Sequence, residues 1–256
     1  MNLIISLRSE ILKTKRTAAF YFTLIGAALI PFLFLINSIT DGLPDEGDSS
    51  KDPLNGIFML STQMTGIAIF PLFVVLVCAL LPGIEHRNNT WKQVLATPQS
   101  RANVFLSKFM NIHLLMIFFL VATHVFMWLV TIAIHFILPE LDVLNQPLNI
   151  AAVWRMLGNS YVTILAVSVL QFLIGLKFKN FLVPVGIGVA LWLIGTVMSL
   201  EYNSDLADYF PYSFHTFEFS PEHRPRLTEV KWRSLIYAVV FLVIGFWDFS
   251  RRRLNA

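Results

Sequence analysis

The chain has 256 residues, of which 56% are hydrophobic and only 14% charged, and its mean hydropathy is +0.66. A soluble domain carries about 45–50% apolar and about 25% charged residues, so this composition excludes an ordinary soluble domain. The formal net charge of +3 is too small to indicate nucleic-acid binding by itself, and the single cysteine, Cys78, excludes an intramolecular disulfide.

Residues 1–16 predict an amphipathic helix that lies on the membrane surface. Apolar Ile4, Leu7 and Ile11 recur at helical spacing. The basic side of the helix consists of Arg8, Lys13, Lys15 and Arg16. No small-residue cleavage site follows, so the segment is not a secretory signal, and a frayed basic tail is the alternative.

Six apolar stretches can each cross a bilayer as a helix, which takes about 20 residues. They are residues 17–39, 58–81, 112–138, 154–176, 181–200 and 232–249. Their continuous apolar character favours helices over the alternating strands of a β-barrel. The sequence therefore predicts a single all-α, polytopic membrane domain with six transmembrane helices.

The distribution of lysine and arginine predicts that both termini are cytoplasmic. With six spans, thirteen of the 19 basic residues fall on the side of the termini, and the excess of basic residues marks the cytoplasmic side. This asymmetry explains the positive net charge without nucleic acid. The long outer loop, 201–231, holds an aromatic stretch at 209–217, which we expect to return to the membrane interface or to pack over the bundle.

The only sizeable inner loop, 82–111, predicts a short amphipathic helix just below the bilayer. Thr90 can cap this helix. Trp91, Val94 and Leu95 follow at positions i, i+3 and i+4, which gives one apolar face. From the residues alone, such a helix either anchors the loop at the interface or docks into a partner protein.

A second helix begins shortly after this one. Pro98 ends the short helix, and Ser100 can cap the next one. That next helix carries Arg101 and Lys108 toward the membrane.

The segment from Glu85 to Lys108 resembles the cytoplasmic loop of ABC-2 type transporter permeases, especially the six-span subunits of lantibiotic-immunity and bacitracin-type exporters. After a second span it has an acidic residue with Arg, then Thr-Trp, Leu, Thr-Pro, Arg and a final Lys. The amphipathic first helix and the aromatic loop before the sixth span agree too, so the resemblance covers essentially the whole chain. One departure is that Asn88 and Asn89 stand where the family often has Gly; Asn tolerates left-handed backbone, so the turn is retained.

The resemblance implies that this loop is a coupling helix, which sits in a cleft of a separate ATPase subunit. Trp91, Val94 and Leu95 would form its docking face. Glu85 and Arg87 would hold the loop at the second span, while Arg101 and Lys108 would anchor the third, although ordinary interfacial snorkelling explains these charges equally well. The residues assigned in this way to ATPase coupling are Glu85, Arg87, Trp91, Val94, Leu95, Pro98, Arg101 and Lys108.

The implied machine has two ATPase subunits and two permease subunits, which are either identical or homologous. No G-x-x-x-x-G-K-[ST] phosphate loop occurs in the sequence. We therefore expect a transporter subunit without enzymatic activity or a cofactor of its own, with ATP and Mg bound in the partner ATPases.

Polar and aromatic residues in the second and fifth spans suggest a route for an amphipathic substrate, because these spans line the permease interface in the resembling family. The candidates are Thr62, Gln63, Phe70, Phe73 and Thr196. Packing between helices is the alternative role for each of them.

Three histidines recur every eleven residues and so share one face of the third span: His113, His124 and His135. Adjacent members are about 16 Å apart along the axis, too far to bind one metal ion together. We expect a polar seam that faces other helices, and no metal site.

The resemblance thus implies the permease subunit of an ATP-driven exporter in a bacterial cytoplasmic membrane. It also implies an amphipathic cargo, such as an antimicrobial peptide, a drug or a lipid. One alternative is an immunity protein that binds its ligand at the membrane without transporting it. A membrane-embedded enzyme is another, but it needs clustered catalytic groups, and the spacing of the histidines disfavours it.

Overall fold

The computed structural model describes residues 2–40, 52–87, 99–139, 142–145 and 147–251. These residues form helices joined by turns, with no strand in the described ranges, which confirms the all-α prediction. The helices are α1 (Leu3–Thr14), α2 (Ala18–Thr40), α3 (Pro53–Met64), α4 (Phe70–Arg87), α6 (Arg101–Ile137), α7 (Ile150–Thr163), α8 (Leu165–Lys177), α9 (Leu182–Leu200) and α10 (Leu227–Arg251). Shorter segments are the π-helical η2 (Thr65–Ile69) and the 3-10 turns η4 (Asp205–Asp208), η5 (Pro211–Thr216) and η6 (Arg224–Arg226).

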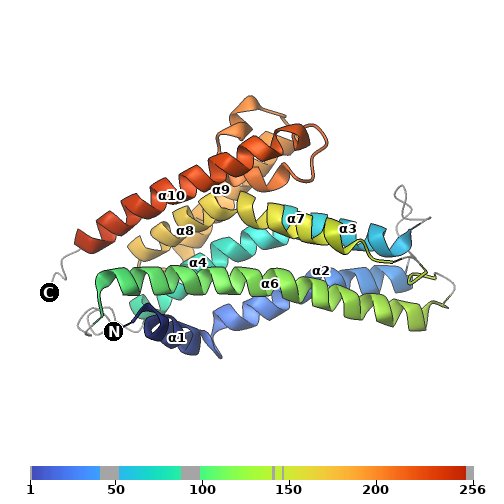
Figure 1. Cartoon of the computed structure of the whole chain (residues 1–256), viewed down its shortest axis with the longest axis horizontal. Helices are drawn as coiled ribbons and strands as arrows, with labels where there is room; N and C mark the ends of the chain where they lie inside the picture. Colours follow the sequence, from blue (N-terminus) through green and yellow to red (C-terminus); the bar gives the residue numbers. More distant parts are fainter. Residues whose placement is uncertain (1, 41–51, 88–98, 140–141, 146, 252–256) are drawn as a thin grey trace.

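The long helices run side by side along the length of the molecule, and both termini lie at one end (Figure 1). We call this the terminal end, and the other the opposite end. Among the described residues, five helices are long and apolar enough to cross a membrane, and a sixth span results if the bent pair α7 and α8 is counted as one. This arrangement confirms a polytopic membrane protein.

Several helices extend beyond the predicted apolar stretches, because local capping sets their ends. The second span begins at Pro53 rather than 58, since the Asp52 side chain accepts a hydrogen bond from the Asn55 amide and proline suits the first turn. The third begins at Arg101 rather than 112, because the Ser100 side chain caps it as expected. The predicted loop 82–111 is therefore helical at both of its ends.

The bend between α7 and α8 has an identifiable cause in α10. The two helices meet at 42°, and Ser234 of α10 inserts at the junction. Its hydroxyl donates to the Val162 carbonyl at 2.7 Å and accepts from the Ala166 amide at 3.3 Å. Helical hydrogen bonding is interrupted at the kink, and the Ser234 hydroxyl bonds the backbone groups of Val162 and Ala166 there. These two groups are therefore not left unsatisfied inside an apolar bundle.

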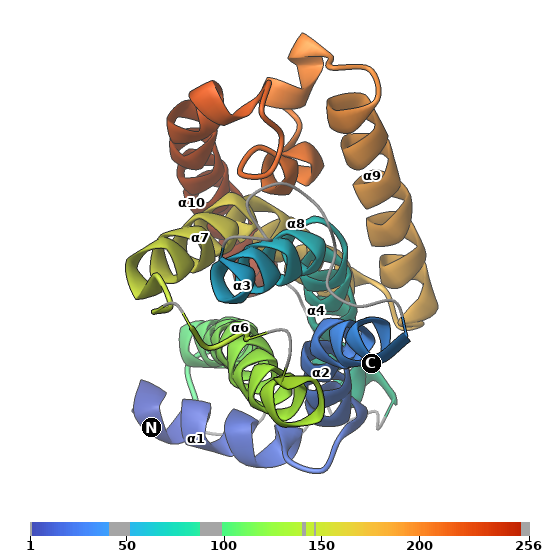
Figure 2. The ribbon, with the colours of Figure 1, turned by 90° about the vertical axis from the view of Figure 1, so that its right-hand side faces the viewer.

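The aromatic part of the outer loop packs onto the bundle, as expected. Tyr212 is buried and donates its phenol to the Gln171 amide oxygen in α8 at 2.9 Å. The Tyr212 carbonyl lies so close to Gly195 of α9 that a Cβ atom there would be 2.4 Å away. The loop thus enters between helices rather than standing in solvent (Figure 2).

Close backbone contact between α4 and α8 depends on Gly175. A Cβ atom at this position would lie 2.3 Å from the Cys78 carbonyl oxygen. We expect Gly175→Ala to force the two helices apart and to lower the free energy of unfolding by about 1–3 kcal/mol, the usual cost of overpacking. Thermal unfolding in detergent measures this.

Gly158→Ala is the matched control, since nothing lies within 4 Å of a Cβ atom at Gly158 in α7. Its stability should be unchanged or slightly raised. Equal stabilities of the two variants would contradict the assigned contact.

Candidate functional site

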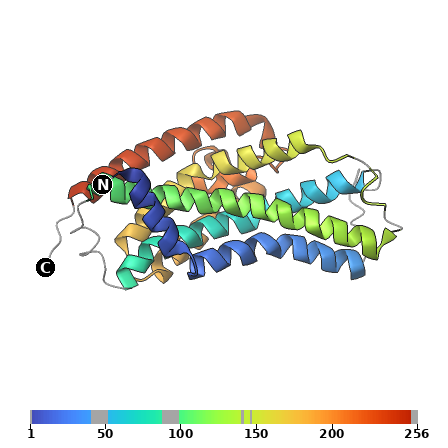
Figure 3. The same ribbon diagram turned by 60° about the horizontal axis from the view of Figure 1, so that its bottom comes forward.

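Four charged side chains meet at the terminal end, where α1, α4 and α6 converge. They are Glu10, Lys13, Glu85 and Lys108, called the charge cluster below. Figure 3 shows α1 crossing α6 near this end. The cluster joins the N-terminal helix to the last turns of α4 and the first turns of α6. It therefore lies beside both helix ends from which the segment between α4 and α6 starts and finishes.

Lys108 is the centre of the cluster. Its ammonium lies 2.7 Å from a Glu85 carboxylate oxygen and 2.8 Å from one of Glu10. Lys13 lies 2.7 Å from Glu10 and 3.3 Å from Glu85. Two cations and two carboxylates make the cluster electrically neutral, so each charge is compensated within it.

Burial makes these contacts depend on one another. The side chain of Lys108 is 1% exposed and that of Glu85 is 3% exposed. A buried charge is costly unless it is paired, and removing one partner of a buried pair typically costs about 3–5 kcal/mol. The cluster therefore holds α1, α4 and α6 in one relative position.

The charges and hydrogen bonds of the cluster also shift the pKa values of Glu10 and Lys13. Burial alone would raise the pKa of Glu10, but Lys108 and Lys13 outweigh it, so this pKa lies below its usual value. Burial alone would lower the pKa of Lys13, but Glu10 and Glu85 raise it above its usual value. Both groups keep their charges over a wide pH range.

The N-terminal helix presents a polar face to the protein. Ser6, Glu10 and Thr14 recur at i, i+4 and i+8 and so share one face. Ser6 donates to the Gln99 side chain at 3.2 Å, and the Asn111 amide donates to the Thr14 hydroxyl at 2.7 Å. Polar contacts thus flank the charge cluster along the whole of α1.

The structure brings some of the predicted coupling residues together. Glu85 and Lys108, which the sequence assigned to different spans, form a direct ion pair. Arg101 lies apart from them and donates to the Ser250 carbonyl at the end of α10. Other predicted coupling residues lie outside the described part of the chain: Trp91, Val94, Leu95, Pro98 and the side chain of Arg87.

Two members of the cluster were not predicted. Glu10 had no assigned role, and Lys13 was placed on the basic side of α1 with Arg8 and Lys15. That placement is wrong, because Lys13, although exposed like Arg8 and Lys15, turns its ammonium toward Glu10 and Glu85. The spacing of Ser6, Glu10 and Thr14 in an apolar helix was the available signal.

The predicted route residues lie at separate places in the bundle. Thr62 donates to the Phe58 carbonyl at 2.7 Å and contacts the His124 ring at 3.1 Å. Phe70 and Phe73 are buried and stack on Phe119, with ring centroids 5.7 and 4.4 Å apart.

The remaining two route residues are half-buried, Gln63 in α3 and Thr196 in α9. The Thr196 hydroxyl lies 3.5 Å from the His215 ring. A role for these five residues in a substrate route stays a prediction.

Two of the three histidines of α6 have partners on other helices, as a polar seam requires. His113 contacts the Tyr161 hydroxyl at 2.8 Å, and His124 contacts Thr62. In the described ranges, no group of three or more His, Cys, Asp or Glu side chains could hold a metal ion.

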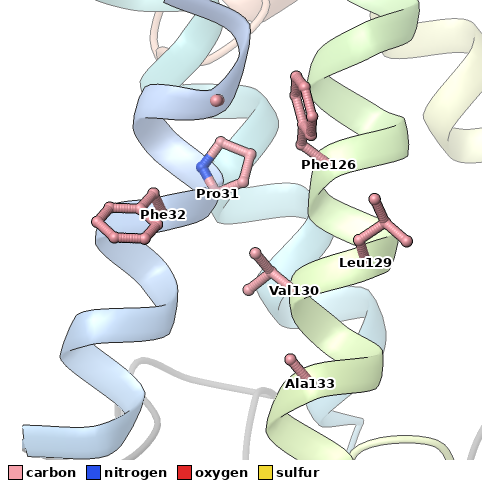
Figure 4. Close-up of a pocket in the computed structure, with 7 residues that line it drawn as sticks. Pro31, Phe32, Phe126, Leu129, Val130 and Ala133 are labelled. Carbon is pink, nitrogen blue, oxygen red and sulfur yellow. The ribbon is translucent and has the colours of Figure 1, made fainter. Parts of the chain in front are cut away.

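A shallow apolar groove of about 190 Å³ lies between α2 and α6, beside Pro31 (Figure 4). Its lining residues all have hydrocarbon side chains: Ala28, Pro31, Phe32, Phe126, Leu129, Val130 and Ala133. A groove without a polar or titratable group cannot carry out acid-base or nucleophilic chemistry, but it can accept hydrocarbon.

Comparison with models of protein families gives a match over most of the chain. A family model described as "ABC-2 family transporter protein" matches residues 6–195, which include the charge cluster and extend into α9. A search of the curated proteins gives no significant match.

Removal of the Lys108 charge should destabilise the terminal end. We expect Lys108→Met to lower the free energy of unfolding by about 3–5 kcal/mol, because Glu10 and Glu85 lose their shared partner. Adding Glu85→Gln should cost less than the sum of the single changes, since the two residues are coupled. Unfolding in detergent measures the free energy of unfolding of each variant. The control is Lys179→Gln at an exposed site, which should change this free energy by no more than about 0.5 kcal/mol. Strict additivity would contradict the ion pair.

The docking of α1 should be insensitive to pH between about 5 and 10. Because the pKa of Glu10 is lowered, the stability that Glu10 contributes to the docking of α1 is fully present above the ordinary pKa of a glutamate. This stability is lost only as the pH falls through the lowered pKa. Because the pKa of Lys13 is raised, the stability that Lys13 contributes to this docking is fully present below the ordinary pKa of a lysine. It is lost only at high pH, as the pH rises through the raised pKa. The mobility of a spin label at Leu12→Cys, an exposed position, reports release of α1. Release near neutral pH would refute the assignment, and Glu10→Gln should remove the transition at low pH.

Proposed function

The chain belongs to the ABC-2 transporter family, and on this premise we propose that it is the membrane-spanning subunit of an exporter driven by separate ATPase subunits. The family supports an ABC transporter permease, a membrane component that is not itself catalytic. ATP and Mg would bind to the ATPases, of which we expect two, together with a second permease subunit that is identical or homologous.

The charge cluster is the observation that carries this proposal. A permease without a nucleotide site must receive force from its ATPase through contact, and a stiff path is needed from the contact to the spans. Glu85 and Lys108 fix both ends of the chain between α4 and α6, and Glu10 ties them to α1. A load on that segment would therefore move α4 and α6 together rather than bend the loop.

The direction of this load follows from the topology that we propose. The excess of basic residues at the terminal end supports a cytoplasmic position for that end, where ATP is available, and the membrane that we propose is a bacterial cytoplasmic membrane. Closure of the ATPases around ATP would then pull on residues 88–98, with Trp91, Val94 and Leu95 as the docking face. The energy for switching between inward-open and outward-open states comes from the different affinity of the ATPase states for ATP.

The cargo that we propose is amphipathic: an antimicrobial peptide, a drug or a lipid. The apolar groove between α2 and α6 supports a hydrocarbon-bearing molecule, since only apolar side chains line it. The choice among these cargo classes rests on family analogy.

The test is a pull-down of this chain in mild detergent that asks whether an ATPase subunit copurifies with it. We expect Trp91→Ala and Leu95→Asp to abolish capture of the ATPase while the fold stays intact, because each removes part of the apolar docking face. Trp154→Ala is the matched control, since Trp154 is an exposed tryptophan of α7, a helix that contributes no member to the charge cluster, and it should leave capture unchanged. Full capture by both docking variants would refute the docking face.

Coupling can be separated from docking in the same complex. We expect Glu85→Gln to retain the ATPase but to lose the stimulation of ATP hydrolysis by cargo, because the loop is no longer fixed to α6. Stoichiometric ligand binding that is independent of ATP would instead support the immunity-protein alternative.

A further inference from the structure

Three cations converge on one buried carboxylate beside the outer loop, where α7 and α10 lie side by side (Figure 2). They are Arg155 of α7, Arg224 of η6 and Lys231 of α10, and each lies close enough to Glu218 to act on the pKa of its carboxyl group. Glu218 is buried, whereas Arg155 and Arg224 are exposed. We call these four residues the outer cluster.

A chain of hydrogen bonds fixes one cation of the outer cluster in place. The Asn159 amide donates to the Glu218 carboxylate at 2.6 Å, and the Lys231 ammonium donates to the Asn159 amide oxygen at 2.9 Å. Asn159 is itself buried, so this chain runs from the interior to the surface between α7 and α10. An ammonium has three donors, and one contact to Asn159 leaves the other two for a ligand.

Glu218 is a poor counter-ion for this group of cations. Burial raises the pKa of Glu218 above its usual value, although the three cations and the hydrogen bond from Asn159 act in the opposite direction. A single carboxylate of this kind balances at most one of three positive charges. The outer cluster therefore carries an excess of positive charge.

Neighbouring acidic residues do not remove this excess. In the part of the chain that the structure describes, Arg155, Arg224 and Lys231 form no ion pair with any carboxylate. Five other charged side chains of η4, η6 and α10 pair with one another instead: Asp205, Asp208, Arg226, Glu229 and Arg233. Glu222, two residues before Arg224, and Glu201, at the end of α9, are exposed, so water screens both carboxylates.

Two tryptophans place the outer cluster at the depth of lipid headgroups. Trp154 directly precedes Arg155, Trp232 directly follows Lys231, and the two side chains are 63% and 64% exposed. Further along α10, an exposed apolar stripe continues from Trp232 at helical spacing, with Ile236, Val239 and Val243. Exposed tryptophan at the end of such a stripe is typical of the boundary between water and hydrocarbon.

We propose that the outer cluster is a binding site for the phosphate group of an anionic phospholipid. The two guanidinium groups and the free donors of Lys231 bind the phosphate oxygens, because charge-assisted hydrogen bonds of this kind are strong. The acyl chains of the same lipid lie along the apolar stripe of α10. A zwitterionic lipid is disfavoured, since its own cation would enter a site that is already positive.

The apolar stripe is the reason to assign a lipid rather than a free phosphate. A free phosphate would use the cations alone and would leave the stripe without a role in the site. The inference goes beyond the proposed function, since it holds whether or not an ATPase docks.

The experiment uses the full chain in nanodiscs of phosphatidylcholine that contain either brominated phosphatidylglycerol or brominated phosphatidylcholine. A bimane label at Gly158→Cys reports lipid locally, since Gly158 is exposed one turn from Arg155, and the fully buried Cys78 stays unlabelled. We expect brominated phosphatidylglycerol to quench this label more strongly at equal content. In the double variant Arg155→Gln, Arg224→Gln, the relative binding constant of phosphatidylglycerol should fall by about fivefold per charge, roughly 25-fold in total.

The double variant changes exposed side chains and leaves the Glu218–Asn159–Lys231 chain intact, so we expect the fold to be retained. The matched control removes two exposed cations from another place, with Lys177→Gln and Lys179→Gln, and should keep the preference of the unmodified chain. Equal quenching by the two lipids, or an unchanged preference in the double variant, would overturn the proposal. Loss of the preference when inorganic phosphate is added would also overturn it, because that result assigns the outer cluster to a free phosphate.

Discussion

The ammonium of Lys108 is a full charge with almost no access to water, and the terminal end of the molecule is arranged around it. Two carboxylates from different helices lie within 2.8 Å, one from α1 and one from α4. If either helix moved away, Lys108 would stay buried with only one of its two carboxylate partners, and the loss of a partner from a buried ionic group is costly. The main effect of the cluster is to fix the relative position of three helices. Its contribution to the net free energy of folding is secondary.

Elsewhere in the bundle the helices associate by different means, because lipid provides no hydrophobic drive between them. Close packing through small residues and isolated hydrogen bonds takes its place. Gly175 lets α8 approach the α4 backbone, and Gly195 leaves room for the Tyr212 carbonyl because it has no Cβ atom. Ser234 and Gln171 each join two elements through a single polar side chain. A rigid polar terminal end would suit the transmission of force that we propose.

The N-terminal helix has two different faces, one polar and turned toward the protein and one apolar and basic that is exposed. Its polar face is satisfied by the charge cluster and by Gln99 and Asn111. Its outward face keeps apolar and basic side chains that no described part of the chain covers. The first span begins directly after it, so its position also sets where α2 enters the bilayer.

The apolar stretches determined the helical class and the spans, because a bilayer requires every backbone polar group to be bonded within a helix. Local capping by Ser100 could be foreseen from adjacent residues, and so could the packing of the aromatic loop. The ion pairs of Lys108 could not, since residues 10, 85 and 108 are distant in sequence and surface charges of this kind usually only snorkel. The insertion of Ser234 into the α7–α8 bend likewise depends on which helices become neighbours, and that is decided by tertiary packing and not by any local pattern.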